Sequence, residues 1–330
     1  MCRGRLARIL LNRPCVPGRN GVFSRKLTAK PYPEWQEAFI DRHRLPPDYL
    51  DSAHIWLNPL AEGLLLHQKG AGHPVLVGIN GSQGSGKSTA CDYLCKQMEF
   101  DGGVRVAVLS LDDFYLTRSQ REELAQTIHP LFATRGVPGT HDMTLLGTTL
   151  DGLLARSGGG TVSIPRFDKA LDDRRPPVAW DRVAAGVDLV LLEGWCLGAR
   201  PQSGEALAMP VNALERDEDS DGRWRGYVND VIRRDFLPLY RRVDQWVMLR
   251  APSFECIYRW RLEQEEKLAA RTAGGASRIM SSEQVARFVQ FYQRLTGHCL
   301  TELPARVHHL FNLDEQRRIT ACEHRERPSP

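Results

Sequence analysis

A glycine-rich segment between a short apolar run and a predicted helix constrains this chain more than any other feature. Val75–Val77 leads into the segment GINGSQGSGKST, Gly78–Thr89, which contains the pattern G-x-x-x-x-G-K-[ST]. Glycine permits backbone angles that turn successive N–H groups towards phosphate oxygens, and the start of the following helix adds partial positive charge. We therefore expect the nucleotide phosphates to be held by Gly81, Ser82, Gln83, Gly84, Ser85, Gly86, Lys87, Ser88 and Thr89.

The last residues of this loop carry the specific chemistry. Lys87 is expected to reach the terminal phosphates of ATP, and the hydroxyl of Ser88 is expected to ligate Mg²⁺. The loop alone indicates only a nucleoside triphosphate, because ATPases, GTPases, kinases and motors share it. The sequence contains no N-K-x-D guanine motif and no segment like an ABC-type signature, which disfavours a switch or a motor.

Four apolar runs rich in Val, Ile and Leu read as buried strands of a parallel sheet. They occupy residues 75–79, 104–111, 188–194 and 244–251. Helical patterns lie between them, and this alternation predicts a doubly wound α/β fold. We expect a single domain over residues 34–330, with two helices before the first strand and an exposed polar insertion near 199–225.

Carboxylates follow the second and third predicted strands. Asp112 and Asp113 come directly after the second strand, and Glu193 ends the third. Ligands in such sheets bind beyond the carboxyl ends of the strands, and phosphoryl transfer needs a held Mg²⁺ and an aligned acceptor hydroxyl. We expect Asp112 to accept the hydroxyl proton and Glu193 to act on the metal side. Asp113 fits a turn cap equally well, and the sequence does not decide which of the two neighbours is the base.

Two loops between these strands, 133–142 and 164–177, concentrate charged residues among glycines and prolines. Their charged residues are Arg135, His141, Arg166, Asp168 and Lys169, among others. Cations presented by loops on a rigid scaffold suit a small anionic substrate, so Arg135 and Arg166 are expected to bind a carboxylate-bearing acceptor. Ordinary surface charge is the alternative for both arginines, and for His141 a hydrogen-bonded loop position.

A charged helix predicted at 258–268 follows the fourth strand. Its residues Arg259 and Arg261 could close over the transferring phosphate as part of a lid. Salt bridges along the helix surface are the alternative.

The first 33 residues differ in composition from the rest. They carry eight Lys or Arg and no acidic residue, which leaves 36 basic and 40 acidic residues in the remainder. The body is therefore slightly acidic, which gives no argument for a nucleic-acid partner. We expect a disordered basic extension and a cytoplasmic protein, with a mitochondrial or plastid transit peptide as the alternative. No run approaches the length of a membrane span, so no membrane partner is expected.

Together these motifs resemble the P-loop D-glycerate 3-kinases of plants and their fungal and bacterial relatives. The resemblance rests on segments such as GINGSQGSGKST, VLSLDDFYLTR, RGVPGTHDMTLL, IPRFDKALDDRRPP and LLEGWCLG, and extends from about residue 50 to 320. The chain is more distantly similar to pantothenate kinase, uridine kinase and phosphoribulokinase. The resemblance implies a three-layer α/β/α fold like that of nucleoside monophosphate kinases.

The resemblance also implies an activity, namely transfer of the ATP γ-phosphate to the 3-hydroxyl of D-glycerate with Mg²⁺ as cofactor. Lys87, Asp112 and Glu193 match the family's motif positions, and so do Arg135, His141 and Arg166 of the acceptor loops. Two other readings remain open. One is a kinase of another small hydroxylated acceptor, and the other is a P-loop protein that binds ATP for regulation.

Overall fold

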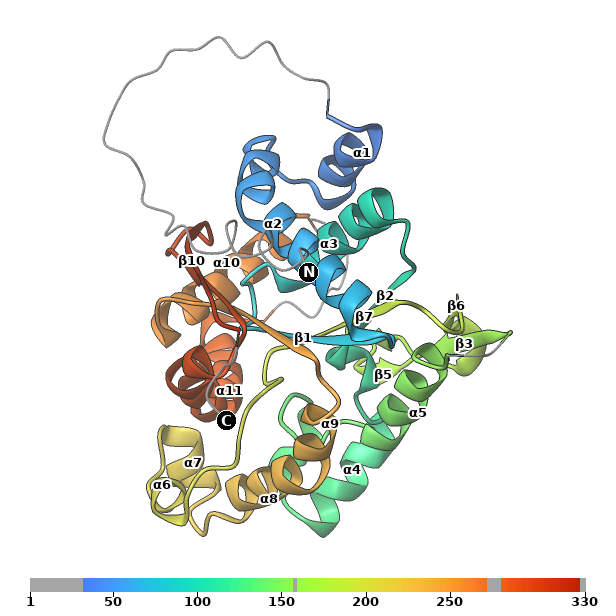
Figure 1. Cartoon of the computed structure of the whole chain (residues 1–330). Coiled ribbons are helices and arrows are strands. Elements are labelled where there is room, and N and C mark those ends of the chain that lie inside the picture. The colour runs from blue at the N-terminus through green and yellow to red at the C-terminus, as the bar shows by residue number, and fades with distance from the viewer. Residues whose placement is uncertain (1–31, 157–158, 272–279, 327–330) are drawn as a thin grey trace, which may run out of the picture.

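A six-stranded sheet forms the centre of the molecule (Figure 1). The computed structural model describes residues 32–156, 159–271 and 280–326. The sheet order is β10-β9-β8-β1-β7-β2, and every neighbouring pair is parallel except the antiparallel pair β9–β10. The strands are β1 Val75–Gly81, β2 Val106–Ser110, β7 Leu189–Gly194, β8 Gln245–Arg250, β9 His309–Leu313 and β10 Ile319–His324. The mainly parallel α/β fold is therefore confirmed, and β9 and β10 extend it beyond the four predicted strands.

Helices cover both faces of this sheet, because successive strand residues point to opposite sides. In β1, Val75 and Val77 pack into one apolar core, whereas Leu76 packs into the other. The first core is shared with α2 Asp48–Ala71, α3 Lys87–Gly102 and α10 Phe254–Arg271. The second core is shared with α5 Met143–Leu153, α8 Arg223–Val231 and α11 Ser282–Glu302. These are the three layers of an α/β/α fold (Figure 1).

The two helices before the first strand are α1 Glu34–His43 and α2. Along α2, Leu57, Leu60, Ala61 and Leu64 are all buried and recur at the spacing of one helical face. That face packs beside α3 over the sheet. The helix α2 thus covers a face of the sheet and contributes to its core.

Shorter elements connect these layers. They are η1 Leu111–Phe114, α4 Arg118–Thr127, η2 Pro130–Ala133, β3 Thr161–Ile164, β4 Phe167–Asp168, β5 Asp173–Arg174, η3 Pro177–Ala179, β6 Asp181–Ala184, α6 Gly204–Ala208, α7 Ala213–Glu218, η4 Ile232–Phe236, α9 Leu237–Tyr240 and η5 Leu303–Ala305. In the part of the chain that the structure describes, no helix combines the length and apolar character needed to cross a membrane. Of the predicted basic extension at 1–33, all but the last two residues lie outside the described residues.

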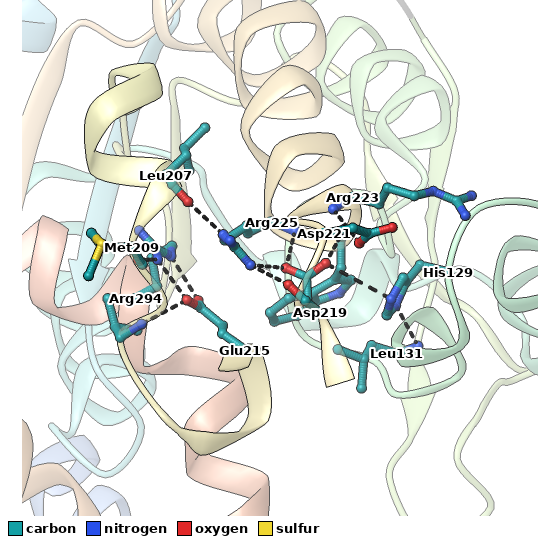
Figure 2. A network of polar contacts seen from close by, with 12 residues as sticks. His129, Leu131, Leu207, Met209, Glu215, Asp219, Asp221, Arg223, Arg225 and Arg294 are labelled. Carbon is teal, nitrogen blue, oxygen red and sulfur yellow. Dashed lines mark hydrogen bonds and ion pairs between the residues drawn. The ribbon is translucent and has the colours of Figure 1, made fainter. Parts of the chain in front are cut away.

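The segment 199–225 is largely exposed, as its sequence suggests, but part of it is tied to the core. It contains α6 and α7, and two of its acidic residues are buried in ion pairs (Figure 2). Glu215 pairs with Arg294 of α11 at 2.6 Å, and Asp219 pairs with Arg225 at 2.8 Å. Leu214, next to Glu215 in the chain, packs into the apolar core. These buried charges are thus neutralised inside the protein, whereas the other charged residues of the segment are exposed.

The same network brings His129 close to Asp219 and Asp221 (Figure 2). Nδ1 of His129 accepts a hydrogen bond from the backbone N–H of Leu131, so the neutral ring carries its proton on Nε2. That nitrogen faces Asp219 at 3.9 Å. Asp219 also accepts from Arg225 and from the backbone N–H of Trp224. The arrangement therefore fixes the segment to the core, and it offers no free nitrogen ligand to a metal.

Candidate functional site

The phosphate-binding loop joins β1 to α3, as the sequence predicts. Gly86 precedes the first residue of α3 with φ 85°, and Gly84 has φ 79°, both in the left-handed region that favours glycine. No side chain among the described residues caps the N-terminus of α3, so its N–H groups remain available to an anion. The hydroxyl groups of Ser82 and Ser85 are buried with no hydrogen-bond partner in the described part of the chain. These orphaned donors fit a loop built to surround phosphate.

Glu193 lies beside the loop at the end of β7. Strand register places it opposite Ile79 of β1 and Ser110 of β2. Its Oε1 accepts a hydrogen bond of 2.8 Å from the hydroxyl of Ser88, and its Oε2 lies 3.6 Å from Nζ of Lys87. Magnesium prefers oxygen ligands and retains several waters, so Ser88 and Glu193 form a donor set that fits this ion.

Asp112 lies in η1, directly after β2. Its Oδ2 accepts from Nζ of Lys169 at 2.8 Å, and its Oδ1 accepts from the hydroxyl of Tyr115 at 3.1 Å. Burial alone would raise the pKa of Asp112, but the positive charges of Lys169 and Lys87 outweigh it and hold the pKa below its usual range. The carboxylate of Asp112 is therefore ionised, and it lies close enough to Lys87 for the two charges to attract each other.

Asp113 has a different environment from its neighbour. It accepts hydrogen bonds from Arg166 at 2.5 Å and from the backbone N–H of Phe167 at 3.0 Å. Burial raises its pKa and outweighs the attraction of Arg166. Asp113 therefore anchors the β4–β5 hairpin. Of the two neighbours it is Asp112, rather than Asp113, that lies beside the phosphate loop.

The two arginines predicted for the acceptor gather around the same hairpin, and both are paired with protein carboxylates. Arg166 contacts Asp181 as well as Asp113. Arg135 pairs with Asp172 and lies over the ring of Phe167 at 5.2 Å. An acceptor carboxylate would have to compete with these partners.

His141 is neutral in this structure, unlike the cation that its position suggested. Its ring is 5 % exposed and stacks on Tyr115 with 4.5 Å between centroids. Burial lowers its pKa to about 4, against the opposing attraction of Asp112. Neither ring nitrogen has a hydrogen-bond partner among the described residues. A neutral imidazole can donate from one nitrogen and accept at the other, so His141 is equipped for a hydroxyl group.

Two contacts of Asp112 were not assigned from the sequence. Tyr115 lies three residues after Asp112 in the same turn, and the DDFY segment could have indicated it. Lys169 lies at the tip of the β4–β5 hairpin, where Asp168 accepts from two backbone N–H groups. Its approach to Asp112 depends on how the hairpin folds back, and no local pattern encodes that.

The predicted lid arginines lie on α10. Arg259 pairs with Glu315 in the turn between β9 and β10. Arg261 lies over the ring of Phe288 on α11 at 5.5 Å. In this structure Arg259 is thus engaged at the β9–β10 turn, in the manner of the salt-bridge alternative.

A parallel sheet, a glycine-rich loop before α3 and acidic side chains at the next strand ends define a P-loop protein of the phosphotransferase type. Comparison with known proteins gives the family. No protein-family model matches the chain. It is 32% identical over 271 residues to the protein named uncharacterized kinase mug58 of Schizosaccharomyces pombe, covering 78% of this chain and 93% of that protein. It is 31% identical over 229 residues to the chloroplastic D-glycerate 3-kinase of Arabidopsis thaliana, covering 66% of this chain but only 46% of that protein.

A solved structure agrees with these relatives. The D-glycerate 3-kinase of Cryptococcus neoformans superposes with a TM-score of 0.65 at 26% identity, covering 82% of this chain and 99% of that one. The chain belongs to the glycerate-kinase type of P-loop kinases. It is accordingly a phosphotransferase with an alcohol group as acceptor.

Proposed function

We propose that this kinase transfers the γ-phosphate of ATP to the 3-hydroxyl of D-glycerate and forms 3-phospho-D-glycerate. The observation that carries the proposal is the surroundings of Asp112. An ionised carboxylate beside the phosphate-loop lysine also contacts Lys169, whose ammonium group suits an acceptor carboxylate. Two relatives named D-glycerate 3-kinase support the same acceptor.

The phosphate side follows from the loop. The N–H groups at the start of α3 and the ammonium group of Lys87 bind the phosphate oxygens. Ser88 and Glu193 would hold Mg²⁺, which supplies positive charge to the phosphates when bound. In the present geometry Lys87 and Ser88 both contact Glu193, so nucleotide and metal would replace contacts that already hold these side chains in place.

The acceptor side centres on Asp112. An acceptor hydroxyl that donates to its carboxylate passes its proton there as the oxygen bonds to the γ-phosphorus and the bond to ADP breaks. A carboxylate on the same acceptor draws the ammonium group of Lys169 away from Oδ2 and frees that oxygen. His141 has two unsatisfied ring nitrogens for the remaining hydroxyl of glycerate. The site thus matches a small molecule with one carboxylate and neighbouring hydroxyl groups.

The second candidate is a kinase of another small hydroxylated acceptor, such as a nucleoside. The chain is 30% identical over 166 residues to a protein named uridine-cytidine kinase B from Dictyostelium discoideum. The rings of Tyr115 and Phe167 flank the site, but they pack on each other at 5.3 Å, and Tyr115 also stacks on His141. The ammonium group of Lys169 at the hairpin tip favours an acidic acceptor instead.

The test is release of ADP by the purified chain with Mg-ATP and one acceptor at a time. The acceptors are D-glycerate, L-glycerate, pantothenate and uridine, with an acceptor-free reaction as background. NMR of the product shows which hydroxyl carries phosphate. Turnover with D-glycerate alone and formation of the 3-phosphate are expected. Turnover with uridine and none with D-glycerate would refute the proposal and indicate a nucleoside kinase.

A matched pair of variants tests the role of Asp112. Asp112→Asn removes the proton acceptor and should lower kcat by orders of magnitude. Asp113→Asn changes the neighbouring carboxylate in the same way but touches Arg166, so it should lower kcat far less. If Asp112→Asn keeps near-normal turnover, Asp112 is not the base.

A further inference from the structure

A cavity lies away from the phosphate-binding loop, on the face of the sheet that carries α8 and α11. It opens between α9, the first residues of β8 and η5, and its volume is about 310 Å³. This volume is at the lower end of the range for small-molecule pockets. None of the loop residues, Asp112 or the acceptor-loop residues lines it.

Two aromatic rings and the backbone of the buried Gly198 form the floor of this cavity. The rings of Trp246 and Tyr240 meet edge to face with 5.3 Å between centroids. Gly198 has φ 91°, and a Cβ atom at that position would lie 3.1 Å from Leu303 and 3.4 Å from Trp246. Glycine at position 198 therefore allows the backbone to lie against Leu303 and Trp246, and a larger side chain there would press on both residues.

The rim of the cavity is cationic. Arg200, Arg241 and Arg306 line it, and none of its lining residues is acidic. Among the residues that the structure describes, Arg200 and Arg241 have no ion-pair partner, and Arg306 reaches only Glu302, at 3.9 Å. The neighbouring Arg242, which does not line the cavity, is by contrast paired with Asp151 at 2.6 Å. Three like charges around one small opening repel one another, and an anion would relieve this repulsion.

We propose that this cavity binds a phosphate monoester with a small, flat organic body. A phosphate monoester presents three terminal oxygens and can accept hydrogen bonds from three guanidinium groups at once, whereas a carboxylate has only two oxygens. The rings of Trp246 and Tyr240 supply apolar contact for the organic part. The molecule is a bound ligand and not the phosphorylated acceptor, because neither the phosphate loop nor Asp112 reaches this cavity.

Isothermal titration calorimetry of the full chain with phenyl phosphate tests the proposal, with benzyl alcohol as the uncharged analogue. Saturable binding of phenyl phosphate and none of benzyl alcohol are expected. The double variant Arg241→Ala/Arg306→Ala should weaken binding by at least about tenfold. Arg200→Glu, which reverses a single rim charge, should weaken it independently.

Two controls separate this cavity from other anion sites. Arg242→Ala removes a neighbouring exposed arginine that does not line the cavity and should leave the affinity unchanged. Lys87→Ala weakens phosphate binding at the catalytic loop, but it should also leave the affinity of the cavity for phenyl phosphate unchanged. Absence of saturable binding to the intact chain would refute the proposal. So would an affinity that survives in both rim variants, or one that is lost in Lys87→Ala.

Discussion

Replacing His141 by phenylalanine should make the folded protein more resistant to acid. His141 is buried against Tyr115 and its pKa in the folded chain is lowered to about 4, from an ordinary value of 6.5. As the pH falls through this interval, the unfolded chain takes up a proton on this ring and the folded chain does not. Proton uptake by the unfolded state favours unfolding, so the neutral histidine costs stability as the pH falls from 6.5 towards 4.

The size of the effect follows from the shift. At about pH 4.5 the unfolded ring is almost fully protonated and the folded ring only partly, which corresponds to a loss of about 2.5 kcal/mol relative to neutral pH. Phenylalanine has a similar size, can keep the stacking on Tyr115 and cannot be protonated. The ring of His309 also has a lowered pKa, of about 3, but it is present in both proteins and cancels in the comparison.

Urea unfolding of the intact chain and His141→Phe, at about pH 7.5 and pH 4.5, measures this difference. Between pH 7.5 and pH 4.5, the free energy of unfolding of the intact chain should fall by about 2.5 kcal/mol more than that of the variant. His73→Phe is the matched control, because it removes an exposed histidine. If the two stability curves of the intact chain and His141→Phe run parallel with pH, His141 is not buried in the neutral form described above.

Three further outcomes follow from the structure. Lys87→Met should lower kcat by orders of magnitude, measured as ADP release, because the terminal phosphates lose their ammonium partner. Lys169→Met should raise the Michaelis constant for D-glycerate far more than that for ATP, and equal changes in both would exclude a contact with the acceptor carboxylate. Arg294→Met leaves Glu215 charged and buried, and should cost about 3–5 kcal/mol in urea unfolding. Adding Glu215→Leu should recover most of that loss, and a double variant as unstable as the single one would contradict the ion-pair argument.

Much of the fold could be predicted because its signals are local. The four predicted strands, β1, β2, β7 and β8, lie within mainly apolar runs, and the glycine pattern of the loop fixes its place between β1 and α3. The carboxylates Asp112 and Glu193 could be placed by the rule that parallel strands end at one edge of the sheet. The register that sets Glu193 opposite Ser110 agrees with that rule.

The remaining features depend on contacts between distant segments. The charges at 199–225 correctly indicate a largely exposed segment, but nothing in that stretch reveals that Arg294, about eighty residues later, buries and neutralises Glu215. The burial of His141 under Tyr115 similarly requires both loops to be folded, so its loss of charge could not be read from the sequence. Local patterns thus identified the residue types of the site, and tertiary packing determined their charge states and partners.

The neighbours Asp112 and Asp113 show how packing assigns different roles to equivalent residues. Asp113 accepts hydrogen bonds from Arg166 and from the backbone N–H of Phe167. These contacts hold the hairpin, and Lys169 at its tip reaches Asp112. On the proposed function, Arg166 therefore acts one step away from the acceptor, as a positioning residue for Lys169. The cation that meets the acceptor first is then the lysine at the hairpin tip, whose side chain is the more exposed of the two. Lys169 leaves Asp112 only when another anion replaces that carboxylate as its partner. An acceptor without a carboxylate therefore binds less tightly. Selectivity for a hydroxy acid thus follows from the same contact that keeps Asp112 ionised.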